Sequence, residues 1–385
     1  MDFNLTEEQR LLKESVDRLV AGRYDFEQRR RHQAAEEGWS REVWAEFAEL
    51  GLLGLPIPEA HGGFGGGPVE TMIVMEAFGR GLVVEPYLAT VILGGGALRH
   101  GGSAEQQARY LPVIADGSHI LAFAQTERQS RYDLFDIATT ARREGSGYVL
   151  DGHKGVVLHG DSADTLLVTA RTGGGRRDHE GIGLFLIDAN APGVGRRGFP
   201  TQDGLRAAEI SLSGVRVESG AAIGDPENAL PLIERMVDGA MTALCAEAVG
   251  AMAQMHALTV EYLTTRRQFG VAIGSFQALQ HRAVDMFVAL EQARSMAMLA
   301  TMMVEEEDAA ERARTIAAAK VQIGRSGRLI GQEAVQLHGG VGVAMEYKVG
   351  HYFKRVTMID TLFGNADHHL GRVAESGSLV AVTIA

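Results

Sequence analysis

Residues 262–286 read YLTTRRQFGVAIGSFQALQHRAVDM, the most informative stretch of this 385-residue chain. Apolar residues at helical spacing lead into it over 232–262, and the pattern resumes after Phe276, so two helices broken by a turn are predicted. Gly270 and Gly274 end the first helix. The break contains forked cations, an aromatic ring and amide side chains, namely Arg266, Arg267, Gln268, Phe269 and Gln277. These groups suit the binding of a phosphate and a flat heterocycle. The alternative, favoured by composition alone, is a solvated basic turn.

The overall composition excludes several functional classes. Asp and Glu number 49 against 37 Lys and Arg, and the net charge of −12 argues against a protein that binds nucleic acid by neutralising its backbone. The single Cys245 excludes an intrachain disulfide and a multi-cysteine metal site, and its Ala-rich surroundings predict a buried, inert thiol. No metal site is predicted.

Two features argue against membrane insertion. No uninterrupted apolar stretch reaches the length needed to span a bilayer, and the N-terminus has the pattern of a charged amphipathic helix and not of a signal peptide. A cytoplasmic protein is therefore predicted.

The first third of the chain has a helical period. Thr6 followed by two acidic residues is a typical N-cap, and an amphipathic helix follows it. A Gly-rich loop at 61–67 follows no strand and precedes no Lys-Ser/Thr, so a phosphate-binding loop is excluded. Further helices are predicted from Ser40 and over 69–79, 87–100 and 104–115.

The middle of the chain changes to a period of two. The hairpin turn of this region is expected at Asp151-Gly152, and the polar run TGGGRRDHEG at 172–181 is expected to be an exposed loop between strands. From Pro226 the pattern is helical again, and its methionines are expected to fill gaps in a helical core. Strands are predicted over 120–127, 138–143, 148–158, 165–172, 183–188 and 209–217.

Five segments, in this order, resemble the acyl-CoA dehydrogenases: MDFNLTEEQRLLKESVDRLV at 1–20, GLLGLPIPEAHGGFGGG at 51–67, AFAQTE at 122–127, RRQFG at 266–270 and QLHGGVG at 336–342. The resemblance covers nearly the whole chain. It implies an α+β fold with an N-terminal helical domain, a middle β-barrel or sandwich domain and a C-terminal four-helix bundle, over 1–118, 119–225 and 226–385. It also implies FAD as cofactor and α,β-dehydrogenation of an acyl-CoA thioester, an oxidoreductase activity of lipid metabolism.

The family's catalytic base has no counterpart at either of its known positions. The usual glutamate position, before a glycine, falls on Phe363, and the alternative position falls on Ala240. No catalytic residue is therefore predicted in this chain. The nearby carboxylates are expected to lie at the surface or to cap helices, namely Asp360, Asp367 and Asp238. The nearby histidines, His368 and His369, are expected to be solvated.

The family's flavin-binding segment in the middle domain is changed in the same way. Thr126, Glu127 and Asp133 are kept, but Arg131 and Tyr132 replace a Gly-Ser pair where the backbone must approach the ring closely. The positions of the family's flavin-wall Trp and Thr are taken by Val156 and Leu158. A flavin held by this chain alone would therefore lack hydrogen-bond partners, at about 1–3 kcal/mol each.

The family's second set of flavin contacts, which one subunit donates to the FAD diphosphate of its neighbour, is kept. The resemblance assigns it to Arg266, Gln268, Phe269, Gln277, Gln336, Gly339 and Gly340. The pattern predicts the non-catalytic type of subunit in an α2β2 heteromer, with a homologous partner that binds the acyl-CoA. It is similar to the two-gene dehydrogenases of steroid side-chain degradation, and an electron-transfer flavoprotein is the expected acceptor.

Three other functions stay open at this point. The chain could be a homomeric dehydrogenase with a relocated carboxylate base, a flavin monooxygenase on the same fold, or a non-enzymatic scaffold subunit. Arg355 is expected to be a helix-face cation, with a subunit interface or a CoA phosphate as the alternative contact.

Overall fold

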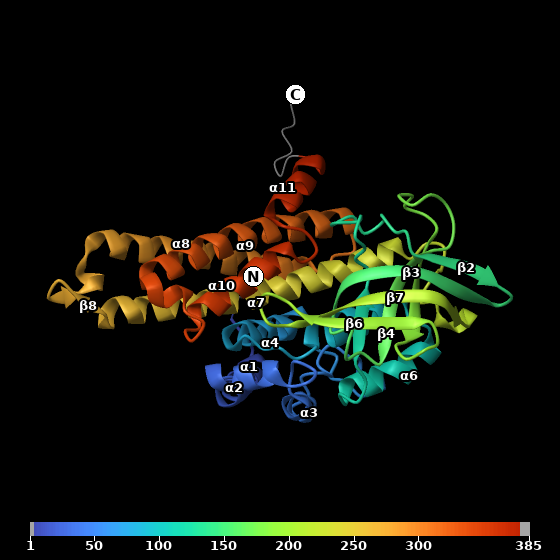
Figure 1. Cartoon of the computed structure of the whole chain (residues 1–385), viewed down its shortest axis with the longest axis horizontal. Coiled ribbons are helices and arrows are strands. Elements are labelled where there is room, and N and C mark those ends of the chain that lie inside the picture. Colours follow the sequence, from blue (N-terminus) through green and yellow to red (C-terminus); the bar gives the residue numbers. More distant parts are fainter. Residues whose placement is uncertain (1–3, 378–385) are drawn as a thin grey trace. The chain divides into compact units, whose positions relative to one another are not determined.

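The computed structural model of the chain describes residues 4–377, which form helices, then a sheet, then helices again (Figure 1). By compactness the chain divides into two units. The helical unit contains the chain up to Arg29, residues 68–83 and the chain from Met241; the sheet unit contains residues 30–67 and 84–240. This grouping follows packing and not sequence order, so the three predicted segments, 1–118, 119–225 and 226–385, stay a prediction.

The helical unit is built around long helices that pack side by side. Thr6 forms a capping box with Gln9 at the start of the first helix, and Asp308 accepts two backbone amides at the start of α9. Helices α4 and α7 touch backbone to backbone, since a Cβ on Gly250 would lie 1.9 Å from Glu76 O. The elements are α1 (Glu7–Arg23), α4 (Pro68–Gly81), α8 (Gln277–Met303), α9 (Ala309–His338), η5 (Gly339–Val343), α10 (Val349–Thr361) and α11 (Ala366–Glu375). Two helices are divided between the units, α2 (Phe26–Ala34) after Arg29 and α7 (Leu230–Thr265) after Ala240.

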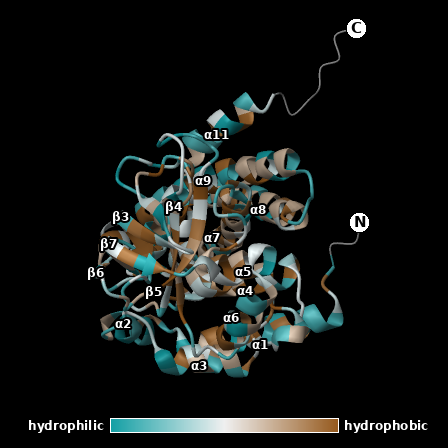
Figure 2. Cartoon of the chain, turned by 90° about the vertical axis from the view of Figure 1, so that its right-hand side faces the viewer, coloured by the Kyte–Doolittle hydropathy of each residue, from teal (hydrophilic) through white to brown (hydrophobic). Residues whose placement is uncertain are grey.

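The sheet unit contains one seven-stranded mixed sheet, ordered β1-β4-β2-β3-β7-β6 with β5 paired to β4. β1 runs parallel to β4, whereas β3 and β7 form a long antiparallel pair. Figure 2 shows hydrophobic residues along these strands, and every residue of β4 is buried. The strands are β1 (Leu121–Ala124), β2 (Thr140–Glu144), β3 (Gly147–Leu158), β4 (Thr165–Arg171), β5 (Ile182–Asp188), β6 (Val194–Pro200) and β7 (Arg206–Val217). The helices are α3 (Arg41–Glu49), η1 (Glu59–His61), η2 (Leu88–Gly94), α5 (Gly95–Gly101), α6 (Ala104–Ala115) and η3 (Ser219–Ala221).

The predicted fold class is confirmed, but one predicted turn is wrong and two elements were missed. Asp151-Gly152 lies inside β3 and not at a hairpin turn, because both sides of it pair with β7 and a register shift accommodates the glycine. The chain reverses instead between Glu144 and Gly147, which pair at the end of β2 and β3. Helix α2 and strand β6 were not predicted, since FEQRRRHQA and VGRRGFP carry no clear apolar period.

The structure bears on three predictions about α7: its thiol, its methionines and its suitability as a membrane span. Cys245 is buried, and burial raises the pKa of its thiol to about 12, so the predicted inert thiol is confirmed. Three of the four methionines on this helix, Met241, Met252 and Met255, are fully buried and Met236 is 2% exposed, as expected of core gap-fillers, whereas Met302 on α8 is 41% exposed. However, α7 is long and apolar enough to pass a length-and-composition test for a membrane span, which the search for uninterrupted apolar runs missed, and 89% of that window is buried inside the protein.

Candidate functional site

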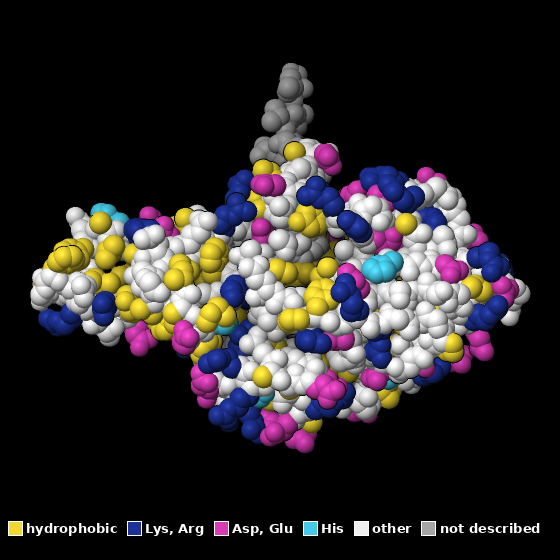
Figure 3. Space-filling model, viewed as in Figure 1, with side chains coloured by type: hydrophobic (Ala, Val, Ile, Leu, Met, Phe, Trp, Pro, Cys, Tyr) yellow, Lys and Arg dark blue, Asp and Glu magenta, His cyan; other side chains and the backbone are white. Residues whose placement is uncertain are grey.

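The predicted break between α7 and α8 is a small β-hairpin at the surface. Strands β8 (Arg267–Gln268) and β9 (Val271–Ala272) pair, and the two residues between them, Phe269 and Gly270, both have positive φ, 54° and 79°, as in a type I′ turn. The Phe269 side chain is 89% exposed. Figure 3 shows hydrophobic side chains gathered over the part of the surface where Figure 1 labels β8 and α8. The hairpin therefore presents its ring and amides outward.

The polar groups predicted to bind a cofactor are exposed and largely unengaged. Within residues 4–377, the side chains of Arg266, Gln277 and Gln336 make no hydrogen bond or ion pair with the rest of the chain, and only Gln268 has an internal acceptor, Arg267 O at 2.8 Å. The backbone at Gly339 and Gly340 is open, because an added Cβ would meet nothing within 4 Å. These groups can therefore bind a ligand or partner without breaking an internal contact.

Two of the predicted segments meet at one end of the helical unit. The Tyr262 ring, one turn before Arg266, lies 4.5 Å from the His338 ring, which sits two residues after Gln336. Arg266 is held to the same turn, since its backbone amide donates to Tyr262 O at 2.8 Å. The arginine segment and the QLHGGVG segment are thus brought together, as a shared ligand would require.

The segment that resembles the family's flavin loop is fixed internally by Glu127. Its carboxylate accepts the backbone amides of Ala138 and Thr139 at 2.7 and 3.0 Å and pairs with Lys154 Nζ at 2.7 Å. Burial alone would raise the pKa of Glu127, but Lys154 and these hydrogen bonds lower it to about 2. Burial lowers the pKa of Lys154 to about 8 against the attraction of Glu127.

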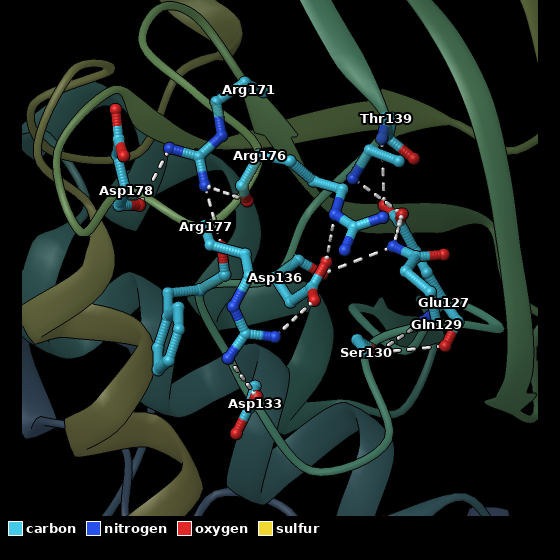
Figure 4. A network of polar contacts seen from close by, with 12 residues as sticks. Glu127, Gln129, Ser130, Asp133, Asp136, Thr139, Arg171, Arg176, Arg177 and Asp178 are labelled. Atoms are coloured by element: carbon cyan, nitrogen blue, oxygen red, sulfur yellow. Dashed lines mark hydrogen bonds and ion pairs between the residues drawn. The ribbon is translucent and has the colours of Figure 1, made fainter.

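The other side of the same loop is fastened by the TGGGRRDHEG loop at 172–181, which is exposed between β4 and β5 as predicted (Figure 4). Arg177 donates to Asp136 at 2.8 Å and to Asp133 at 2.9 Å. Arg176 pairs with Asp136 at 3.0 Å, and Asp136 is only 1% exposed. Asp133, a position at which this chain resembles the family, is therefore engaged by an arginine of this chain.

A buried arginine and an aromatic stack complete this contact between the two loops. Arg171, at the end of β4, donates to Phe135 O at 2.7 Å and to Arg176 O at 2.8 Å, one carbonyl from each loop. The Phe135 ring stacks on His179 with centroids 4.3 Å apart, and the Arg177 guanidinium lies 5.3 Å from the same ring. Sequence reasoning missed this network, since nothing in a polar loop indicates which carboxylates it pairs with.

Bulky residues stand on strained backbone at the predicted flavin contacts. Arg131 and Val156 both have φ of 46°, in the left-handed region, which is a genuine outlier for a β-branched residue. Val156 lies where β3 shifts register against β7 between Lys154 and Val157, and it is 46% exposed. The backbone at both positions has a shape suited to glycine, although each carries a larger side chain.

The turn at the family's base position is rigid and carries no free carboxylate. Phe363 has φ of 58°, and its carbonyl oxygen lies 3.1 Å from His369 Nε2. Lys320 Nζ donates to Leu362 O at 3.1 Å, and Asp360 accepts the Ala366 amide at 3.0 Å. Asp360 is thus a cap, as predicted, and its second oxygen lies 4.0 Å from Arg328.

Three side chains of this region differ from their predicted environments. His369 is fully buried and not solvated, and burial lowers its pKa to about 3. Asp238 is buried in α7 and neither a surface carboxylate nor a cap, whereas Asp367 is exposed as predicted. Arg355 is not a helix-face cation, because it is 4% exposed and forms a bidentate pair with Glu247 at 2.5 and 2.7 Å. Of these three, the Arg355 difference depends on a partner that is distant in sequence, since Glu247 lies 108 positions away.

Sequence comparisons show to which family the chain belongs. Family profiles described as acyl-CoA dehydrogenase N-terminal, middle and C-terminal domain match residues 6–118, 122–215 and 231–377. Acyl-CoA dehydrogenase FadE27 of Mycobacterium tuberculosis is 30% identical over 97% of this chain and 98% of its own length.

Several solved structures share the fold over nearly the whole chain. The ChsE4-ChsE5 complex from Mycobacterium tuberculosis superposes with a TM-score of 0.87 at 28% identity, covering 97% of this chain and 98% of that one. The Tcur3481-Tcur3483 steroid ACAD gives 0.87 at 30% identity, with 96% and 97% covered. An FAD complex of PigA gives 0.89 at 26% identity, with 97% and 98% covered.

Proposed function

Since the chain belongs to the acyl-CoA dehydrogenase family, we propose that it is the subunit of a heteromeric FAD-dependent dehydrogenase that lacks its own catalytic base and flavin wall. In this role it completes the FAD site of a homologous partner subunit. The partner supplies the base and binds the acyl-CoA thioester. Two of the structural relatives are complexes of two named proteins, and one of these is called a steroid ACAD, which supports this type of assembly.

The observation that carries the proposal is the turn at Phe363. A dehydrogenase needs a group that removes the α proton of the thioester, and a phenyl ring cannot do so. The nearest carboxylate in sequence, Asp360, caps α11 and is buried. This arrangement argues against a homomeric dehydrogenase with Asp360 as a relocated base.

The flavin loop gives independent support. Its acidic groups are engaged inside the sheet unit, where Glu127 pairs with Lys154 and Asp133 with Arg177. Arg131 stands where close backbone approach is needed and Val156 at a flavin-wall position, both on backbone that suits glycine. These residues do not fit a flavin ring, and this also argues against a monooxygenase, which needs a complete flavin site.

In the helical unit, the donor groups near the ends of α7 and α9 fit the diphosphate half of the same cofactor. A forked guanidinium, two amide side chains and an open glycine backbone match the donors that a diphosphate requires, and they belong to Arg266, Gln277, Gln336, Gly339 and Gly340. Bound FAD supplies the hydride acceptor for dehydrogenation of the thioester. The residues of this chain hold and orient that cofactor from across the subunit interface.

The surface around these donors supports a protein partner. Contiguous exposed apolar side chains on soluble proteins commonly mark protein–protein contacts. Here they lie on the hairpin, on α8, and on η5 and the residues just after it. Val284 on α8 is 57% exposed, and Val343 at the end of η5 is 71% exposed. The group comprises Phe269, Val271, Phe276, Val284, Phe287, Val288, Val341, Val343 and Met345. An α2β2 heteromer in the cytoplasm, acting on steroid side-chain thioesters and passing electrons to an electron-transfer flavoprotein, is the most specific form of the proposal.

Co-expression tests the proposal directly. We expect the chain alone to purify without flavin absorbance, and the chain expressed with the homologous subunit of the neighbouring gene to form a yellow complex with one FAD per pair. The solution mass of the complex and its flavin content are measured together. A stable yellow homo-oligomer with one FAD per chain overturns the proposal, and a colourless complex favours the scaffold function.

A further inference from the structure

Three aromatic rings form a stack beneath the exposed donor groups of the helical unit. The His338 ring lies between Tyr262, with centroids 4.5 Å apart, and Tyr347, with centroids 5.1 Å apart. His338 is 2% exposed and is the last residue of α9. The stack therefore joins three segments: the end of α7, the end of α9 and the chain that follows η5.

Hydrogen bonds fix the orientation of the imidazole within this stack. His338 Nδ1 lies 2.7 Å from Ala334 O, and because a carbonyl only accepts, Nδ1 carries the proton. Nε2 then accepts from the Tyr347 hydroxyl at 3.3 Å. Burial lowers the pKa of His338, which favours the neutral ring, although the backbone carbonyls of Ala334 and Leu258 act in the opposite direction. Both ring nitrogens are thus used, and the ring cannot rotate without losing two bonds.

Two of the three rings, Tyr262 and His338, are connected through the backbone to donor groups of the proposed diphosphate site. The Arg266 amide donates to Tyr262 O, so the position of Tyr262 sets the start of the hairpin. Gln336 is two residues before His338 on α9, and Gly339 follows it. η5 packs against the same residue, because a Cβ on Gly342 would lie 3.1 Å from the His338 Cβ.

We propose that His338 is a positioning residue that, with Tyr262 and Tyr347, holds the hairpin and the QLHGGVG segment in register so that Arg266, Gln336 and the Gly339-Gly340 backbone converge on one dinucleotide diphosphate. The inference rests on the proposed function. His338 does not touch the ligand and acts through the backbone of these segments. A merely structural stack would stabilise the unit without affecting how tightly the diphosphate is bound.

Two substitutions test this role in the assembled complex with the partner subunit. His338→Phe keeps a ring between the tyrosines but removes both hydrogen bonds, and Tyr347→Phe removes only the hydroxyl. We expect the dissociation constant of FAD to rise on the order of 10-fold in His338→Phe and about threefold in Tyr347→Phe. Tyr110→Phe is the matched control, because Tyr110 also packs on a histidine, with centroids 5.7 Å apart, in the sheet unit.

A second measurement needs no FAD and so separates this inference from the proposed function. Trypsin cleavage after Arg266 and Arg267 is followed in the chain alone, and the rate is expected to rise about fivefold in Tyr347→Phe and not in Tyr110→Phe. If Tyr347→Phe is cleaved faster but the wild-type complex binds no FAD, the three rings hold the two segments in register, and the role in binding a diphosphate is refuted. Unchanged cleavage and an FAD affinity within twofold of wild type in Tyr347→Phe overturn the inference, even where His338→Phe does not fold.

Discussion

Replacing Arg266 by Gln should weaken FAD binding to the heteromer without affecting its assembly. The guanidinium is exposed at the end of α7 and has no internal partner within residues 4–377, so its loss leaves no buried group unpaired. A hydrogen bond to a charged group contributes about 1.5–3 kcal/mol, whereas an exposed ion pair contributes about 0–1 kcal/mol. A diphosphate covered by two subunits is closer to the first case. A loss of about 2 kcal/mol corresponds to a dissociation constant about 30-fold higher.

Arg267→Gln provides the matched control for this substitution. Arg267 is the next residue, is also exposed and lies in β8, and the family resemblance assigns the diphosphate contact to Arg266 and not to Arg267. FAD is titrated into the deflavinated complex while its fluorescence is followed, and the mass of each complex is measured. We expect less than a threefold change in the control. The affinity of the wild-type complex should also fall more steeply with added salt than that of Arg266→Gln, because one charge pair is missing in the variant.

Two results would refute the reasoning. If both variants bind FAD within threefold of the wild-type complex, Arg266 does not contact the diphosphate. If Arg266→Gln fails to assemble while Arg267→Gln assembles normally, the guanidinium serves the subunit interface and not the cofactor.

Arg355→Met should lower the free energy of unfolding in urea by about 3–5 kcal/mol, because it leaves the buried Glu247 carboxylate unpaired. Adding Glu247→Gln to this variant should recover part of the lost stability. A loss below about 1 kcal/mol in Arg355→Met would contradict the pairing. Arg177→Ala should increase amide exchange in the loop between β1 and β2 by about tenfold, whereas Arg142→Ala, which breaks an exposed pair, should not; equal exchange in both would exclude the two-loop contact. The buried His369 has its pKa lowered from 6.5 to about 3, so the unfolded chain binds the extra proton and stability falls as pH drops below about 6.5; His369→Phe should remove up to about 1.4 kcal/mol per pH unit of this slope, and an unchanged slope would show that the ring is solvated.

Local sequence signals predicted the parts of the fold that depend on local physics. The period of α7, the alternation of the strands and the capping pattern at Thr6 each express a preference of neighbouring residues, and the structure agrees with them. The turn of the β2–β3 hairpin was predicted at the wrong position. The turn preference of Asp-Gly competes there with pairing to β7, a strand more than fifty residues away. Tertiary pairing overrode the turn preference.

The environments of charged side chains could not be predicted, for a related reason. Arg355 and Glu247 are 108 positions apart, and Arg177 and Asp136 are 41 apart. A periodic pattern shows which face of a helix is buried but not which single charge lies on that face beside an opposite one. The family resemblance indicated which positions had lost their usual residues, and only the structure shows what these residues contact instead.

The distribution of engaged polar groups gives the strongest argument for a shared site. At the degraded half, Glu127, Asp133 and Asp360 all have partners within their own unit, so evolution of this chain has used their hydrogen bonds for internal structure. At the retained half, Arg266 and Gln336 have none within residues 4–377, although nothing in the packing prevents a partner from being there. A scaffold freed from cofactor binding would gain by engaging both halves. Donors left open on one half alone are expected where a second protein brings the ligand, and Arg266→Gln measures that difference.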